Sequence, residues 1–239
     1  MAGVYYTPAV ANSNPVETNE TDASRGGLQA LFACGMRTST KLWLLATLLV
    51  AALESVHGGP IWNEATYLSC VNMRGSCPSL ALAGSSLTGT LPTEIGRLTS
   101  VTMLRLTYNG LTGSIPTELG LLTELSDLRL SQTSLSGSLP TEIGRMTSMK
   151  LFRLGAIENL TGSIPTEIGR LTSALQLYLY GNQLTGSMPS ELGLLTALRE
   201  LSLEDNHLTG SIPSELGDMP SLTELCVSRT INPCVGART

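Results

Sequence analysis

One ten-residue stretch is written six times along the chain, and this repetition constrains the fold more than any other feature. Each copy is close to LTGSIPTELG, and the prolines of successive copies lie 24, 24, 25, 24 and 24 residues apart. A period this regular is typical of a solenoid, in which every unit packs only on its neighbours. The six prolines are Pro92, Pro116, Pro140, Pro165, Pro189 and Pro213.

Leucines at alternate positions precede most copies, as at Leu104 and Leu106 or at Leu201 and Leu203. Such alternation predicts a short strand with one buried face. Parallel strands buried on both faces read as continuous apolar runs, so the polar residues between the leucines place the other face in water. We therefore predict an α/β repeat solenoid with seven parallel strands in an exposed inner sheet and short helical or 3-10 turns on the outer side.

The repeated stretch reads as the turn and outer wall of each unit. Its Leu points inward, its first Gly takes a backbone angle that a Cβ would resist, and its Pro fixes the first residue of a helical turn. A Glu follows two residues later, and the second Gly ends the turn. Six aligned carboxylates allow a metal-binding or catalytic interpretation, but the helix dipole alone explains an acidic residue in the first turn. The six are Glu94, Glu118, Glu142, Glu167, Glu191 and Glu215.

An asparagine follows three of the predicted strands, at Asn109, Asn182 and Asn206. A carboxamide that points inward at this position can bond the N–H and C=O groups of adjacent turns. The unit with the 25-residue interval reads GAIENL after Leu154 and is one residue longer than the others. We therefore expect a bulge and a break in the asparagine register there.

The unit from Leu195 to Gly217 follows the pattern LxxLxxLxLxxNxLxGxIPxxLG and resembles the plant-type leucine-rich repeat. The resemblance covers residues 80–228 and implies a leucine-rich repeat horseshoe. Members of that family include ectodomains of receptor-like kinases, receptor-like proteins that lack a kinase, and secreted inhibitors of wall-degrading enzymes. The resemblance also implies capping segments, which we place at residues 59–79 and 229–239.

Two pairs of cysteines bracket the repeats, Cys70 with Cys77 before them and Cys226 with Cys234 after them. Neither pair has histidines or further cysteines at zinc-site spacing, so we expect two disulfides formed in an oxidising compartment. The fifth cysteine, Cys34, stands alone near the N-terminus.

Residues 36–58 have the layout of a secretory signal peptide that begins at Met36. Two basic residues precede an apolar run over residues 42–53, which is shorter than the roughly 20 residues that a membrane-spanning helix needs. We expect cleavage, with Met36 as the true start and residues 1–35 as a disordered N-terminal extension without helical or strand periodicity. The alternative is a signal anchor formed by residues 42–56, which would tie the chain to a membrane with the repeats outside the cell.

Charge and histidine content exclude several classes of function. The formal net charge is -5, and the two lysines, Lys41 and Lys150, lie far apart, so no basic patch is available for nucleic acid. The two histidines, His57 and His207, have no nucleophile or orienting acid in register, and no Gly-rich phosphate loop precedes a helix. We therefore expect no enzymatic activity, no metal site and no cofactor.

The residues between the strand leucines form columns on the predicted inner sheet, about 4.8 Å apart from unit to unit. Arginines and one aspartate occupy the N-terminal units, glutamates the C-terminal units, and two tyrosines the junction. A binding face would use the arginines for a carboxylate or sulfate and the tyrosines for flat apolar contact. The alternative is a solvated surface whose arginines pair with the aspartate and with water. These residues are Arg105, Arg129, Arg153, Asp127, Tyr178, Tyr180, Glu200, Glu204 and Glu224.

We therefore expect a secreted or cell-surface recognition module that binds a protein, peptide or glycan through its inner sheet. The alternatives are an inhibitor of an extracellular glycosidase or protease, and a structural component of a cell wall or surface. Asn159-Leu160-Thr161 is also an acceptor sequence for N-glycosylation in an exported protein, and we expect Asn159 to lie in a tight turn.

Overall fold

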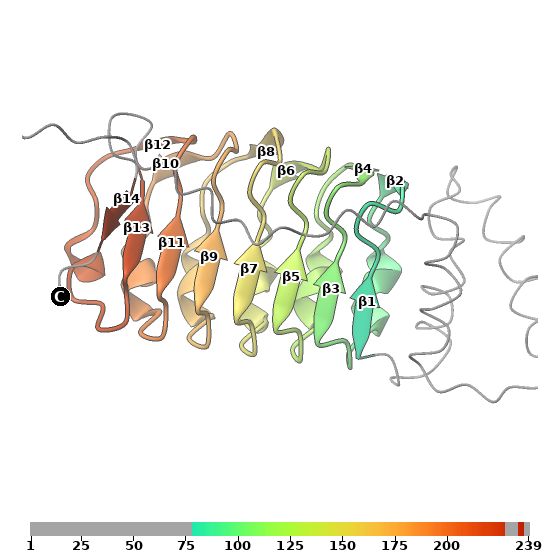
Figure 1. Ribbon diagram of the computed structural model, residues 1–239, viewed down its shortest axis with the longest axis horizontal. Helices are drawn as coiled ribbons and strands as arrows, with labels where there is room; N and C mark the ends of the chain where they lie inside the picture. The colour runs from blue at the N-terminus through green and yellow to red at the C-terminus, as the bar shows by residue number, and fades with distance from the viewer. Residues whose placement is uncertain (1–77, 228–233, 237–239) are drawn as a thin grey trace, which may run out of the picture. The chain divides into compact units, whose positions relative to one another are not determined.

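The computed structural model describes residues 78–227 and 234–236. The N-terminal extension, the signal segment and the first cysteine pair lie outside the described residues. The described part is an array of stacked coils, each of which contributes one strand to a continuous inner sheet (Figure 1).

The inner sheet has eight strands in the order β1-β3-β5-β7-β9-β11-β13-β14. The first seven are parallel, which confirms the prediction from the alternating leucines. The eighth runs antiparallel to β13 and is an addition to the prediction, since its residues read as a turn-rich cap. The strands are β1 (Ser79–Ala81), β3 (Met103–Arg105), β5 (Asp127–Arg129), β7 (Leu151–Arg153), β9 (Gln176–Tyr178), β11 (Glu200–Ser202), β13 (Glu224–Cys226) and β14 (Cys234–Gly236).

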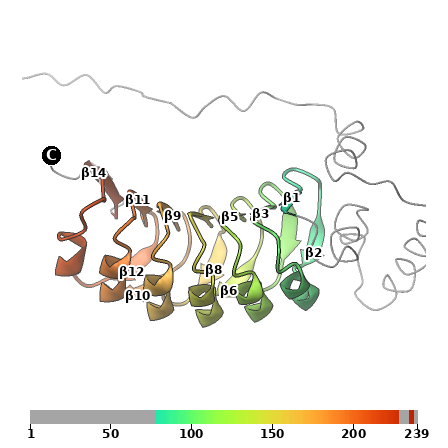
Figure 2. The same ribbon diagram turned by 90° about the horizontal axis from the view of Figure 1, so that it is seen from below.

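The outer side of the coils consists of 3-10 helices, and Figure 2 shows them along one side of the array with the inner sheet along the other. Each helix begins one residue after the repeated proline. Pro116, with φ -70° and ψ 143°, is therefore the N-cap and not the first helical residue as predicted. The repeated Glu does lie in the first turn. The helices are η2 (Thr93–Arg97), η3 (Thr117–Leu121), η4 (Thr141–Arg145), η5 (Thr166–Arg170), η6 (Ser190–Leu194) and η7 (Ser214–Leu216).

The second glycine of the repeat has a different role from the one predicted. In the first five helices it lies inside the helix and does not end it. A Cβ added at Gly120 would come within 2.3 Å of the carbonyl oxygen of Glu142, and one at Gly144 within 2.6 Å of that of Glu167. The absence of a side chain therefore lets successive helices meet at backbone distance.

Columns of apolar side chains fill the space between the sheet and the helices. The strand register stacks Leu104, Leu128, Phe152, Leu177 and Leu201 directly on one another, and all five have no exposed surface. Complete burial of such a side chain stabilises the fold by roughly 1.5 to 3 kcal/mol relative to exposure. Because each member is covered by the coils on either side, the array is stable only as a stack.

Six further strands of three residues run along the side of the array and were not predicted. They pair in parallel, β2 with β4, β6 with β8 and β10 with β12. Each contains part of the repeated LTG sequence, which was interpreted as a turn from the sequence. They are β2 (Thr88–Thr90), β4 (Gly110–Thr112), β6 (Ser136–Ser138), β8 (Asn159–Thr161), β10 (Thr185–Ser187) and β12 (His207–Thr209).

The three asparagines bridge successive coils in the way that their spacing predicts. Asn109 accepts a hydrogen bond from the Leu87 N–H at 3.0 Å and donates to the Leu82 C=O at 2.8 Å, both in the preceding coil. Asn182 and Asn206 make the equivalent bonds in two later coils. We call this row of side chains the asparagine ladder.

The ladder is interrupted at two successive coils. Thr133 takes the place of asparagine in the first, and its hydroxyl donates to the Leu130 C=O within its own coil. Ile157 takes the place in the second and is completely buried. The extra residue of this longer coil is accommodated in a turn that is closed by the hydrogen bond from the Leu160 N–H to the Ile157 C=O at 3.0 Å. Asn159 is therefore part of a tight turn, as expected, and is also the exposed first residue of β8.

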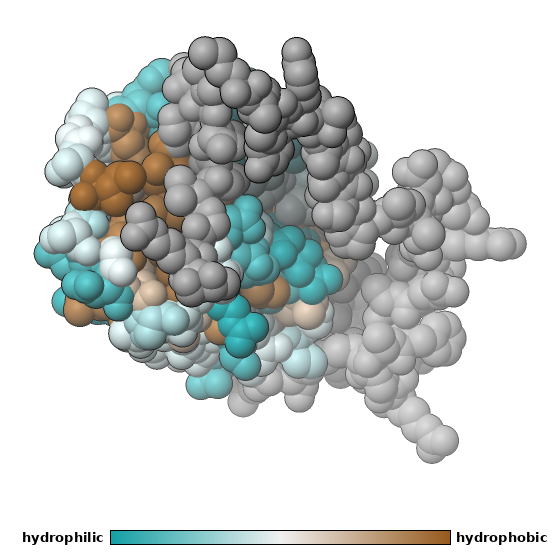
Figure 3. Space-filling view, turned by 60° about the vertical axis from the view of Figure 1, so that its left-hand side comes forward, coloured by the Kyte–Doolittle hydropathy of each residue, from teal (hydrophilic) through white to brown (hydrophobic). Residues whose placement is uncertain are grey.

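Apolar surface is visible at the C-terminal end of the described array (Figure 3). In the last coils Leu208, Leu225 and Val227 are only partly buried, and Ile212 is 50% exposed. The end of a stack leaves one side of its last column uncovered, which is why solenoids need capping segments.

Replacing Asn182 with Ala should lower the free energy of unfolding by about 1 to 3 kcal/mol, because the Ile157 N–H and the Leu154 C=O would lose their partner. Thermal and urea unfolding of the variant measure this loss. Thr172→Ala changes an exposed residue on the outer side and serves as the control. Equal stability of the two variants would show that the ladder does not stabilise the stack.

Candidate functional site

The face of the inner sheet that points away from the leucine core carries two columns of side chains, one on each side of the buried strand position. The first column reads Ala81, Arg105, Arg129, Arg153, Tyr178, Ser202 and Cys226, in the order predicted from the sequence. The second reads Ser79, Met103, Asp127, Leu151, Gln176, Glu200 and Glu224. Both columns run the length of the array, so a ligand lying along it would meet several coils.

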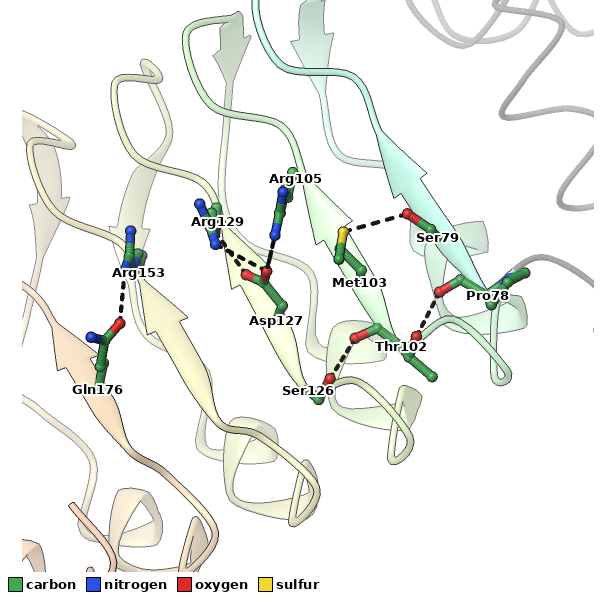
Figure 4. Close-up of polar contacts among 10 residues, drawn as sticks. All are labelled: Pro78, Ser79, Thr102, Met103, Arg105, Ser126, Asp127, Arg129, Arg153 and Gln176. Atoms are coloured by element: carbon green, nitrogen blue, oxygen red, sulfur yellow. Dashed lines mark hydrogen bonds and ion pairs between the residues drawn. The ribbon is translucent and has the colours of Figure 1, made fainter. Parts of the chain in front are cut away.

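Asp127 holds two of the three arginines. Its carboxylate accepts from Arg105 Nε at 3.0 Å and Nη2 at 2.7 Å, and from Arg129 Nε at 2.9 Å and Nη2 at 3.2 Å (Figure 4). Asp127 is 5% exposed, whereas the arginine side chains are 34% and 20% exposed. One buried carboxylate between two cations leaves this group with a net positive charge, and it fixes the direction of both guanidinium groups.

Arg153 belongs to a second network, in which Gln176 lies between its guanidinium and the Glu200 carboxylate. Its Nη2 donates to Gln176 Oε1 at 2.7 Å (Figure 4), and Gln176 Nε2 donates to the Glu200 carboxylate at 2.9 Å. The Tyr178 hydroxyl also donates a hydrogen bond to the Glu200 carboxylate. The ion pairs in the described residues are those of Asp127, so Arg153 has no carboxylate partner there, and its Nε is buried without a hydrogen bond.

The two tyrosines lean toward the coil of Arg153. The Arg153 guanidinium lies 5.1 Å from the Tyr178 ring centroid, a cation–π distance. The Tyr178 and Tyr180 rings are 6.4 Å apart and tilted by 58°. A Cβ at Gly155 would come within 2.4 Å of the Tyr180 ring, so the missing side chain of Gly155 makes the place in which that ring lies. Arg153 and the two rings thus form a preorganised cation–aromatic cluster.

Burial and acidic neighbours keep both tyrosines protonated. Burial is the largest cause that raises the pKa of Tyr178, and its hydrogen bond to Glu200 raises the pKa further. Burial also raises the pKa of Tyr180, with Glu204 adding to the effect. Both hydroxyls therefore act as hydrogen-bond groups and not as anions near neutral pH.

The predicted division of charge along the sheet is present. The N-terminal strands carry Arg105, Asp127, Arg129 and Arg153, and the C-terminal strands carry Glu200 and Glu224, with Glu204 directly after β11. Several of these groups are engaged within the protein, since Glu200 accepts from Tyr178 and Glu204 from Ser202. Arg105 and Arg129 are paired with Asp127, as expected for the solvated surface, whereas Arg153 is not. The binding face stays a prediction.

Two residues of the cluster escape sequence analysis. Gln176 links Arg153 to Glu200, but a lone glutamine between strand leucines reads as ordinary polar filler. Gly155 reads as part of an irregular turn. Aligning the second column as well as the first places Gln176 between Arg153 and Glu200. This alignment would have identified Gln176 from the sequence.

No group of three or more His, Cys, Asp or Glu side chains that could hold a metal ion occurs within residues 78–227 and 234–236. Within those same ranges no helix has the length and apolar character needed to cross a membrane.

The sequence model of the Leucine Rich Repeat family matches residues 100–122, 175–195 and 197–219. No curated protein matches the chain. Among solved structures, the chain is similar to the plant peptide hormone receptor RGFR1 in complex with RGF2, with 40% identity and a TM-score of 0.59 over 60% of this chain and 23% of the receptor.

Two structures from Arabidopsis thaliana are also similar. One is the leucine-rich repeat ectodomain of the membrane receptor kinase GASSHO1/SCHENGEN3 in complex with CASPARIAN STRIP INTEGRITY FACTOR 2, with 37% identity and a TM-score of 0.60 over 68% of this chain and 19% of that one. The other is a BIR3–SERK2 complex, with 34% identity and a TM-score of 0.50 over 56% of this chain and 70% of that one. The chain spans a quarter or less of the length of three receptors that it matches.

Replacing Tyr178 with Phe should remove the tyrosine ionisation that occurs at the highest pH. The folded chain keeps this proton at a pH where the unfolded chain, with the ordinary value of 10.0, loses it. The associated stability is therefore present below pH 10.0 and is lost as the pH rises toward the folded pKa. Tyrosinate absorbance during an alkaline titration measures the step. Tyr108→Phe changes a 66% exposed position and should leave this ionisation in place. If the ionisation remains in Tyr178→Phe, the hydrogen-bond network is refuted.

Proposed function

The chain belongs to the plant-type leucine-rich repeat family, and we propose that it is a recognition module that binds a protein or peptide ligand through its inner sheet. The cation–aromatic cluster of Arg153, Tyr178 and Tyr180 carries this proposal. Arginine and tyrosine are the residue types enriched at the energetic centres of interfaces. The likeness to ectodomains solved with peptide ligands supports the ligand class.

The inner sheet offers a ligand three different kinds of contact in a row. The Asp127 group presents a net positive charge with fixed guanidinium directions, which suits a carboxylate or sulfate. The tilted rings of Tyr178 and Tyr180 offer apolar contact at low entropic cost, since their positions are already set by Arg153 and Gly155. Glu224 adds an exposed negative charge beyond them.

Arg153 is the residue expected to gain most from a ligand. Its charge has no carboxylate partner among the described residues, and Gln176 engages only its Nη2, so the rest of the guanidinium charge is not compensated there. An anionic group of a ligand would form a charge-assisted pair there, and such bonds are about twice as strong as neutral ones.

We further propose that the module acts outside the cell, without enzymatic activity of its own. The strand register sets Cys226 opposite Cys234, as a disulfide between the two requires, and an oxidising compartment would permit that bond. An acceptor sequence on an exposed strand, at Asn159, is compatible with the same compartment.

Replacing Arg105, Arg129 and Arg153 together with Ser should weaken ligand binding by about tenfold or more, which corresponds to about 1.4 kcal/mol. The ligands to be measured are those found in a screen against exported proteins, peptides and cell-wall glycans, with affinity determined by calorimetry. The outer helices supply a matched control, because Arg97, Arg145 and Arg170 are also three exposed arginines in register. Equal losses in both triple variants, or none in the first, would refute the inner sheet as the binding face.

A further inference from the structure

The interruption of the asparagine ladder coincides with a pocket. The pocket has a volume of about 240 Å³ and is lined by Gln132, Thr133, Ser134, Ala156, Glu158 and Asn159. Thr133 is the residue that replaces the first missing asparagine, and the others come from the two turns at which the ladder is broken. The pocket therefore lies between the two turns at which the ladder is interrupted, on the solvent side of the buried Thr133 and Ile157 side chains.

The side chain of the acceptor asparagine lines this pocket. Asn159 and Thr161 are both exposed and lie on the same side of β8, with buried Leu160 between them. The N-x-T sequence is therefore accessible on a strand.

The lining suits a small neutral polyol. Gln132 and Asn159 carry carboxamides, Ser134 carries a hydroxyl and Glu158 a carboxylate, so donors and acceptors alternate around the space. Gln132, Ser134, Glu158 and Asn159 are all exposed. Among the described residues Gln183 donates to the Glu158 backbone C=O, and the polar side-chain atoms of the four residues make no hydrogen bond there. The first sugar of an N-linked glycan carries hydroxyls and an acetamide, which are the complementary groups.

We propose that Asn159 carries an N-linked glycan whose first sugar lies in this pocket and bridges the two coils that lack asparagines. The modification rests on the export of the chain proposed above. In the transfer step Asn159 Nδ2 loses a proton and forms a bond to C1 of the first sugar, while the bond from C1 to a lipid-linked pyrophosphate breaks and the lipid pyrophosphate leaves. The sugar then links the two turns through the polar side chains that line the pocket.

The position also leaves the inner sheet free. β8 belongs to the row of short side strands and pairs with β6, and not with any strand of the inner sheet. A glycan on Asn159 therefore stabilises the array at its interruption without covering Arg153 or the tyrosines.

The test uses the full chain with a host secretion leader in front of it, expressed in a eukaryotic host, so that it does not depend on the chain's own export. Peptide mass spectrometry should find Asn159 occupied. An amidase that removes the whole glycan should lower Tm by about 2 to 4 °C. An endoglycosidase that leaves the first sugar in place should not lower Tm. The Thr161→Val variant leaves Asn159 unmodified but keeps the acceptor Asn19. Its Tm should equal that of the amidase-treated protein.

A second variant, Gln132→Ala combined with Ser134→Ala, separates the pocket from general effects of glycosylation. It should keep the glycan but lose the Tm difference between the two enzyme treatments. An unmodified Asn159, an equal Tm after both enzymes, or an undiminished difference in the double variant would each overturn the proposal. None of these readouts measures ligand binding, so failure here would leave the proposed function of the inner sheet untouched.

Discussion

The parallel pairing of each coil with the next is the interaction on which the rest of the structure depends. It places every residue of one coil against its counterpart in the neighbouring coil, so that leucines stack on leucines and asparagines bond across coils. The outer helices can follow the same spacing only because glycine removes the side chain where they meet, as at Gly120 against Glu142. The strand register and the contacts between helices therefore both require the same repeat length.

The same pairing turns sequence variation into surface columns. Positions that face the core are mostly leucine, isoleucine, methionine or phenylalanine, with Val101 and Ala174 as smaller members, while the inner-sheet positions change from coil to coil. Asp127 contacts two arginines because Arg129 lies two residues along the same strand and the register places Arg105 opposite Arg129 on the neighbouring strand. Arg153 lies one coil further on, beyond the reach of that carboxylate, and is held by Gln176 and Tyr178. Recognition and folding are therefore carried by different residues of the same unit.

The sequence predicts the solenoid, the parallel inner strands and the columns correctly, because these follow from the period and the alternating leucines alone. It misplaces Pro116 by one residue and misreads Gly120, since helix position and coil-to-coil contact depend on three-dimensional spacing. The partner of Arg153 was not foreseen, because a hydrogen-bonded chain through Gln176 leaves no periodic trace. The side strands and β14 were not foreseen either, because the side strands lie in the repeated stretch that was interpreted as a turn and β14 lies in the expected C-terminal cap.

Site-specific photocrosslinking tests the central claim, recognition at the inner sheet, most directly. A photoreactive residue is placed at Tyr180 beside the inner sheet, at Thr141 on an outer helix or at Thr161 on a side strand, and each protein is irradiated with an extract of exported proteins and peptides. The account predicts one discrete adduct that forms from position 180 and not from the other two. An adduct that forms equally from position 141 or 161, or only from one of them, would contradict it.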